Sequence, residues 1–213
     1  AKVSIVSRKV QTTRAQVRAI AVHDKTQIIF VDTPGIFQPK RRLDRAMVTS
    51  AWGGATDADL IGVLIDVARF EHEENTVLLE KLAELKQPKF LILNKIDTVP
   101  KEKLLEFTAK VNERGQFEAT FMVAALTGYG VKDILAWLEK RLPPGPWLYP
   151  EDQISDAPLR FLAAEITREK IFERLHDELP YRSTVETESW QQKPDGSVRI
   201  EQTIYVEREG QRK

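Results

Sequence analysis

The order of apolar and helical segments in the middle of the chain constrains its fold more than any other feature. Apolar runs short enough for buried strands alternate with stretches of helical periodicity. The runs are residues 59–67, 89–96 and 118–125, and the helical stretches are residues 42–52, 73–86, 101–114 and 131–141. This alternation predicts an α/β fold with a doubly wound, mostly parallel sheet.

Two strand-like segments precede this pattern. Residues 16–24 and 26–33 are typical of an antiparallel hairpin with a tight turn near Asp24 and Lys25. The helical stretch that follows contains Gly53 and Gly54, which are poor helix formers. We therefore expect the helix to end there, although a hinge is the alternative.

A proline-rich stretch interrupts the alternation. Residues 142–152, LPPGPWLYPED, contain four prolines and a glycine, which favour a linker over a helix or a central strand. A helix over residues 158–179 and strands over 183–191 and 197–207 follow, with a hairpin turn at Asp195 and Gly196. This order of a helix and two strands indicates part of a small α+β domain.

The helix after the linker has two predicted faces. Its apolar stripe consists of Leu159, Leu162, Ile166, Ile171, Leu175 and Leu179. Its charged residues Glu165, Arg168, Glu169 and Arg174 are spaced as i,i+3 and i,i+4 surface pairs.

Composition excludes several classes of protein. The 213 residues include no cysteine, which excludes disulfides and thiolate zinc sites and fits a reducing compartment. Lys and Arg together number 32, as do Asp and Glu, so a nucleic acid or an anionic membrane would have to bind a local patch. The apolar runs fall short of the ~20 residues of a membrane-spanning helix, and no signal peptide is visible.

The tetrapeptide Asn94-Lys95-Ile96-Asp97 follows a predicted buried strand directly. In open α/β sheets, ligands bind at the carboxyl ends of strands. A carboxylate there can accept hydrogen bonds from an N–H and an adjacent NH₂ group, a donor pair that guanine has and adenine lacks. Asp97 would then select the base, while Asn94 braces the loop or meets a purine acceptor and the stem of Lys95 covers the base. An ordinary polar turn is the alternative.

A second polar cluster, Asp32-Thr33-Pro34-Gly35, ends the hairpin. Mg²⁺ bound to a triphosphate needs a nearby carboxylate, which suits Asp32, often through a water molecule. Gly35 allows the main chain to donate an N–H to a terminal phosphate, and Pro34 fixes the backbone before it. By itself, the cluster also fits a simple Pro-Gly turn.

Two weaker signals complete the set. Thr12 and Thr13 lie between basic residues and can offer a hydroxyl to Mg²⁺, in a loop ordered only when the γ-phosphate is present, or they are a β-prone surface pair. Residues 123–130, VAALTGYG, end another strand with small residues that allow main-chain contact with a base.

Together these motifs resemble the Era family of translation-associated GTPases. The stretches SIVSRKVQTTR, VDTPGIF, NKID and AALTG have that family's order and spacing, and the tail from ELPYRSTVE to IEQTIYVEREGQRK resembles its KH-type RNA-binding domain. The resemblance implies a P-loop-NTPase-like GTPase domain at residues 1–142, a linker at 143–157 and the first part of a KH-type domain at 158–213.

The resemblance also implies residue roles. Thr13, with Thr12 as the less favoured candidate, is the switch threonine and, with Asp32, the metal site. The residues Asp32, Thr33, Pro34, Gly35 and Ile36 form the second switch. Asn94, Lys95, Ile96 and Asp97 read guanine, and Val123, Ala124 and Ala125 back the base. Ile36 stands where Ras-like enzymes have a water-orienting glutamine, so other groups must position the hydrolytic water, and no catalytic residue is assigned. Ala124 stands where the family often has serine.

Two family motifs are not found in the sequence. The phosphate-binding loop G-x-x-x-x-G-K-[ST] is expected just before Ala1, and the Gly-x-x-Gly loop of the KH-type domain just after Lys213. We therefore expect the 213-residue chain to be an internal fragment that is aggregation-prone and inactive by itself.

The function that the resemblance implies is that of a GTP-hydrolysing switch with GTP, GDP and Mg²⁺ as ligands. It implies that small-subunit ribosomal RNA and the small ribosomal subunit are partners, that DNA is not, and that the protein is cytoplasmic with a loose peripheral contact at the bacterial inner membrane. The alternatives are a non-catalytic scaffold with a GTPase-like fold and another ribosome-assembly GTPase.

Overall fold

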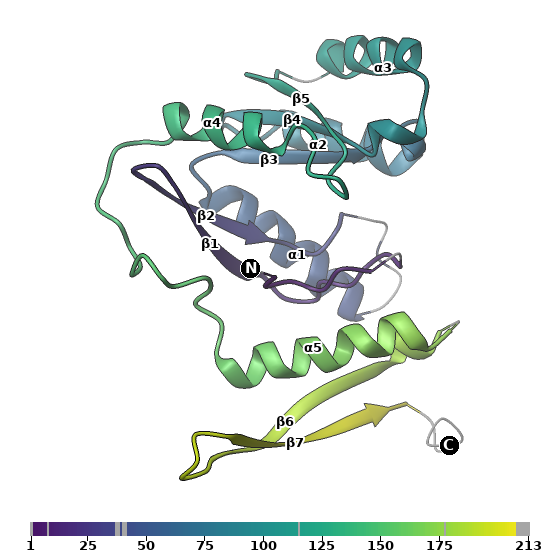
Figure 1. The fold of residues 1–213 in the computed structure, drawn as a ribbon. Helices are drawn as coiled ribbons and strands as arrows, with labels where there is room; N and C mark the ends of the chain where they lie inside the picture. Colours follow the sequence, from purple (N-terminus) through teal and green to yellow (C-terminus); the bar gives the residue numbers. More distant parts are fainter. Residues whose placement is uncertain are drawn as a thin grey trace. The chain divides into compact units, whose positions relative to one another are not determined.

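A computed structural model describes residues 2–7, 9–36, 39, 42–114, 116–176 and 178–207 (Figure 1). The chain forms two compact units. The first unit comprises Ala1–Ile20, Ile29–Pro34 and Asp152–Lys213, and the second comprises Ala21–Ile28 and Gly35–Glu151. The domain boundaries expected from the sequence stay a prediction.

A parallel sheet forms the centre of the second unit. Strands β3 (Ile61–Asp66), β4 (Lys89–Asn94) and β5 (Thr120–Val123) pair in the order β3-β4-β5. Helices α2 (Glu73–Ala83) and α3 (Lys101–Arg114) pack against β3 and β4, whereas α4 (Val131–Arg141) packs against Phe90 and Val123. The predicted α/β architecture with a parallel sheet is confirmed. Strand β3 alternates buried and exposed residues, and Leu64 is 60% exposed.

Helix α1 (Arg42–Asp57) is longer than predicted. The expected end at Gly53 and Gly54 is wrong, because the helix continues through both glycines. Met47, Ala51 and Gly54 are buried on one side of it, and Trp52 and Ala55 pack against the core of the sheet. These contacts outweigh the helix propensity cost of about 1 kcal/mol per glycine.

The predicted hairpin is confirmed as β1 (Val17–His23) and β2 (Thr26–Asp32). Asp24, at the turn, has a positive φ of 47°, a conformation that Asp and Asn adopt more readily than other non-glycine residues. Strand β1 begins in the first unit and ends in the second, whereas β2 begins in the second unit and ends in the first. Ile28 of β2 is buried beside Phe90 and α4 in the second unit.

The proline-rich stretch is hydrogen-bonded to this hairpin. In the second unit, Gln27 Oε1 accepts from the backbone N–H groups of Leu148 and Tyr149, at 2.9 and 3.0 Å, and Trp147 Nε1 donates to the carbonyl of Lys25. In the first unit, the N–H of Ile20 donates to the carbonyl of Ile154 at 2.9 Å. These bonds hold the proline-rich stretch against the hairpin, so its conformational freedom is much smaller than that of a flexible linker.

The C-terminal part of the first unit has the predicted order of elements. Helix α5 (Leu159–Arg174) and the short 3₁₀ helix η3 (Leu179–Arg182) precede strands β6 (Ser183–Gln192) and β7 (Val198–Val206). The strands pair antiparallel, and Gly196 in the turn has φ of 81°. Ala164 and Ile171 of α5 pack against Val185 of β6.

The two predicted faces of α5 are largely wrong. Leu159 and Ile166 of the expected apolar stripe are 65% and 64% exposed. The buried residues are Ala164, Arg168, Glu169, Ile171 and Phe172. Arg168 and Glu169 are only 3% and 6% exposed, so neither lies on the surface, although the predicted i,i+3 pair of Glu165 with Arg168 does form. Apolar periodicity cannot find such a face, because two of its members are charged.

Helices long and apolar enough to cross a membrane are not found among the residues that the structure describes.

Candidate functional site

The carboxyl ends of the parallel strands lie side by side. Asp66 at the end of β3 pairs in register with Asn94 of β4, which pairs with Val123 of β5. The loops that leave these ends therefore start at one edge of the sheet. This is the edge at which open α/β sheets bind ligands.

Asn94 connects two of these loops. Its side-chain oxygen Oδ1 accepts a hydrogen bond from the N–H of Lys95 at 2.8 Å and another from the N–H of Ala125 at 3.1 Å. Both donors belong to residues predicted to face the base. The structure thus supports the bracing role for Asn94, which was one of the two that the sequence left open.

Lys95 has an unusual backbone conformation at this edge. Its φ of 62° and ψ of 37° lie in the left-handed region, which turns the chain sharply after β4. Its ammonium group Nζ pairs with Asp66 Oδ2 at 2.6 Å, while Asp66 Oδ1 accepts from the N–H of Ala68. Sequence reasoning missed Asp66, although its place at the end of the run 59–67 was a usable signal.

Asp97 lies in the 3₁₀ helix η2 (Ile96–Thr98), and its side chain is exposed. Within the described part of the chain, no hydrogen bond or ion pair engages its carboxylate. Ile96 packs against the core of the sheet and so anchors the turn. Both carboxylate oxygens of Asp97 therefore remain available as acceptors for a ligand.

The third loop begins at Val123 and Ala124, which are buried, and continues through the exposed Ala125. The N–H of Ala124 donates to the carbonyl of Tyr129, closing the loop on itself. Gly130 has φ of 75°, and a Cβ atom there would lie 2.4 Å from the carbonyl oxygen of Met122. Glycine is thus required at this position to hold the loop.

The predicted metal-facing pair lies in the first unit. Thr13 Oγ1 donates to Asp32 Oδ2 across 3.1 Å, although 19 residues separate them. The pair consists of hard oxygen donors, and this separation is close to the ~3.0 Å between adjacent ligands of an octahedral ion with bonds of about 2.1 Å. The residues present therefore fit Mg²⁺.

The remaining residues of the predicted second switch are divided between the two units. Thr33 and Pro34 belong to the first unit, and Gly35 and Ile36 to the second. Pro34 is fully buried, Thr33 and Ile36 are half-buried, and a Cβ atom on Gly35 would meet no atom within 4 Å. A ligand can thus closely approach the backbone at Gly35, as a contact with a phosphate requires. The roles assigned to these residues stay predictions.

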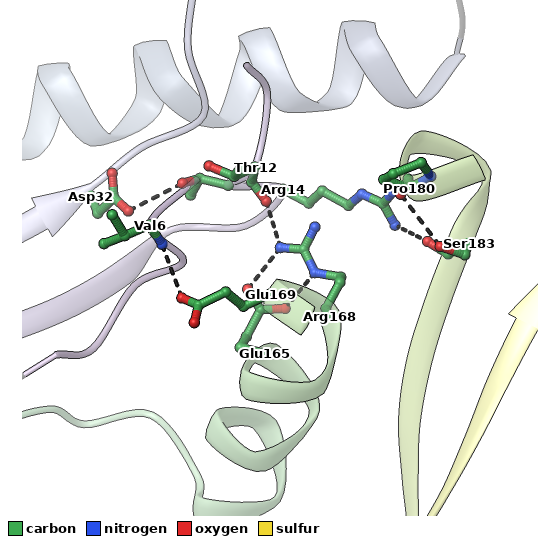
Figure 2. Close-up of polar contacts among 10 residues, drawn as sticks. Val6, Thr12, Arg14, Asp32, Glu165, Arg168, Glu169, Pro180 and Ser183 are labelled. Atoms are coloured by element: carbon green, nitrogen blue, oxygen red, sulfur yellow. Dashed lines mark hydrogen bonds and ion pairs between the residues drawn. The ribbon is translucent and has the colours of Figure 1, made fainter. Parts of the chain in front are cut away.

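Thr12 and Arg14, the two neighbours of Thr13 in the chain, make polar contacts that sequence reasoning missed (Figure 2). Arg168 of α5 donates to the carbonyl of Thr12, and Arg14 donates to carbonyls of η3 and β6. Burial, together with the nearby charge of Arg168, lowers the pKa of the Arg14 guanidinium. The only sequence signal was the basic character of the residues flanking the two threonines.

Comparison with known proteins gives one consistent result. The family model described as 50S ribosome-binding GTPase matches residues 1–95. Over 213 residues, the chain is 64% identical to proteins named GTPase Era from Mesorhizobium japonicum and Sinorhizobium medicae, and it covers 69% of each.

Solved structures agree with this result. The chain resembles Era in complex with MgGDPNP and nucleotides 1506–1542 of 16S ribosomal RNA, with a TM-score of 0.91 and 32% identity, over 99% of this chain and 72% of that one. It also resembles a variant of Aquifex aeolicus Era bound to GDP and AlF₄⁻, with a TM-score of 0.90, 32% identity and the same coverage of both chains.

Proposed function

The chain belongs to the GTPase Era family, and we propose that it is a GTP-hydrolysing switch that acts in small ribosomal subunit assembly by binding ribosomal RNA. Its ligands are GTP and GDP with Mg²⁺, in line with the MgGDPNP and the GDP with AlF₄⁻ that the solved Era structures contain. Relatives that match all 213 residues at 64% identity favour this function over a scaffold or another ribosome-assembly GTPase.

One observation of this structure carries the proposal. Asn94, Lys95 and Ala125 are joined by the hydrogen bonds of one amide oxygen, at the sheet edge where Asp97 offers a free carboxylate. In this arrangement Asp97 accepts from the N–H and NH₂ groups of guanine, and the main chain of residues 123–125 lies beside the base. A purine without that donor pair would leave the carboxylate unsatisfied, which makes the site selective for guanine.

The switch residues act at the phosphate end of the nucleotide. Thr13 and Asp32 would hold Mg²⁺, which neutralises charge on the phosphates when bound. Gly35 would donate its N–H to the terminal phosphate. Loss of that phosphate on hydrolysis removes the contacts at Thr13 and Gly35, so both loops relax.

The test measures binding of GTP and ATP to the full-length protein, with Mg²⁺ and with EDTA. We expect GTP to bind at least 100-fold more tightly than ATP, because ATP leaves Asp97 unpaired, and we expect Mg²⁺-dependent release of phosphate. Binding of an RNA with the sequence of nucleotides 1506–1542 of 16S ribosomal RNA is measured in parallel. Equal affinity for the two nucleotides would contradict the proposal.

Location in the cytoplasm, with a peripheral contact at the inner membrane, stays a prediction. Binding of the full-length protein to vesicles that contain anionic lipid, measured by sedimentation, would test the membrane contact.

A further inference from the structure

Residues 2–14, with the exception of Arg8, which lies outside the described residues, run along α5 and contact it repeatedly. Lys2 and the N–H of Val6 both pair with Glu169, the latter at 3.1 Å. Lys9 Nζ donates to the carbonyls of Phe172 and Leu175 at the end of the helix, at 2.5 and 2.7 Å. A cation is favoured at this position, where helix carbonyls lack partners.

Arg168 holds the part of this stretch that precedes Thr13 (Figure 2). Its Nε and Nη2 atoms donate to the two carboxylate oxygens of Glu165, at 2.8 and 2.7 Å, and Nη2 also donates to the carbonyl of Thr12 at 2.5 Å. The guanidinium lies over the ring of Phe172, 5.6 Å from its centroid. Glu165 and Phe172 therefore fix the orientation of Arg168 before it meets Thr12.

Arg14 holds the part that follows Thr13. Its Nη1 donates to the carbonyl of Ser183 at 2.8 Å, and its Nη2 donates to the carbonyls of Pro180 and Tyr181. Thr13 is thus fixed from both sides by contacts with elements that follow the linker, more than 150 residues away.

The backbone of Gln11 has a conformation that is unfavourable for a residue other than glycine, so surrounding contacts must hold it. Its φ of 57° lies in the left-handed region, which costs roughly 1–2 kcal/mol for a residue other than glycine. Such conformations persist only where surrounding contacts enforce them, and they concentrate at switch regions and ligand clamps. The contacts of Arg168 and Arg14 begin directly after this residue.

We propose that Arg168 is a positioning residue for the metal-facing threonine. By holding the carbonyl of Thr12, it sets the place of the Thr13 hydroxyl beside Asp32 and ties that place to α5. The proposal rests on the proposed function, because it concerns the Mg²⁺ that accompanies the nucleotide. Because Arg168 belongs to α5, a displacement of this helix would change the affinity for Mg²⁺ and the triphosphate, and the reverse would also hold.

One donor of the guanidinium that holds the threonine segment, residues 11–14, has no partner in the described part of the chain. Among the described residues, Arg168 Nη1 is buried and has no hydrogen-bond partner. A buried unpaired donor costs free energy, so a conformation that pairs it is favoured.

The test compares Arg168→Lys with wild type in the full-length protein. Lysine keeps the charge but cannot bind Glu165 and Thr12 together. The Mg²⁺ concentration required for half-maximal binding of fluorescently labelled GDPNP is measured. We expect it to rise about 5- to 10-fold, the net effect of losing one hydrogen bond, while GDP binding in EDTA changes less than twofold.

Three further variants separate positioning from stability. Arg174→Lys, on the exposed side of the same helix, is the matched control and should leave Mg²⁺ dependence unchanged. Glu165→Gln preserves the side-chain volume and should give a smaller rise in the same direction, which decides the question if Arg168→Lys fails to fold. In the background of Thr13→Val, Arg168→Lys should have no further effect on Mg²⁺ dependence.

The outcomes distinguish this proposal from the proposed function. A wild-type protein that does not bind GDPNP with Mg²⁺ overturns the function. Wild-type binding together with unchanged Mg²⁺ dependence in Arg168→Lys, or an equal effect with and without Thr13, overturns only the positioning role of Arg168.

Discussion

The base-facing loops and the threonine segment are held by contacts of different range. At the sheet edge, Asn94 bonds the next residue along the chain and a residue 31 positions away, within one parallel sheet. In the threonine segment, the bond from Arg168 to Thr12 spans 156 positions. The first region therefore depends on the local fold of strand, turn and helix, whereas the second depends on an element that follows the linker.

The difference has a functional consequence. A guanine base is recognised in the same way before and after hydrolysis, so a rigid local scaffold suits its site. The terminal phosphate is present only before hydrolysis, so the segment that senses it has to respond to ligand and partner. Contacts with α5 give the threonine segment such a connection.

The largest expected effect would come from the first region. Asp97→Asn should weaken GTP binding about 100-fold, because the amide cannot accept both donors of guanine. Affinity for xanthosine triphosphate should rise, since the new NH₂ group can donate to the xanthine carbonyl. Stability should change by less than about 0.5 kcal/mol, because the side chain is exposed. Unchanged GTP affinity in a titration would remove Asp97 from the site.

A smaller effect is expected from the brace between the loops. Asn94→Ala removes the acceptor of two N–H groups and should cost about 1–2 kcal/mol of unfolding free energy. GTP binding should weaken as well, because Lys95 and Ala125 lose their common partner. Asn94→Asp keeps the acceptor oxygen and serves as the control in denaturant unfolding. If both variants were as stable as wild type, the loops would not depend on this brace.

The smallest expected effect lies beside the threonine segment and depends on pH. The hydrogen bond from Lys2, followed by that from the N–H of Val6, lowers the pKa of the buried Glu169 carboxyl. A lowered folded-state pKa stabilises the fold above the unfolded pKa of about 4.3, and this contribution is lost as the pH falls through the folded-state pKa.

Glu169→Gln should therefore lower the Tm at pH 7 by about 2–4 °C, and the difference from wild type should shrink below pH 4. Thermal unfolding at both pH values measures this, with Glu173→Gln on the exposed side of α5 as the control. A difference that is constant across this pH range would show that the ion pair at Glu169 does not contribute.

The features that could be predicted from the sequence are those that depend on local contacts. The parallel sheet, the hairpin and the order of α5, β6 and β7 were predictable because each has its own periodicity and turn residues. The motif at residues 94–97 was visible because its members are adjacent in the chain. The role of Asn94 as a brace required the register of β4 and β5.

The errors have a common physical cause. The helix α1 was predicted too short because propensity cannot anticipate the burial of Gly54. The buried face of α5 was assigned wrongly because Arg168 and Glu169 are charged, and charged residues are buried only where partners compensate them, which for Glu169 are the distant Lys2 and Val6. The contacts of Thr12 with α5, and of Arg14 with η3 and β6, leave no local pattern, so only the structure could show them.

Backbone order parameters from NMR relaxation in wild type and Arg168→Lys test the central claim most directly, namely that α5 holds the threonine segment. We predict that the order parameters of residues 11–14 fall in the variant, because the bond to the Thr12 carbonyl is lost, while those of residues 94–97 stay unchanged. Unchanged order parameters in residues 11–14, or an equal decrease in both regions, would contradict the claim.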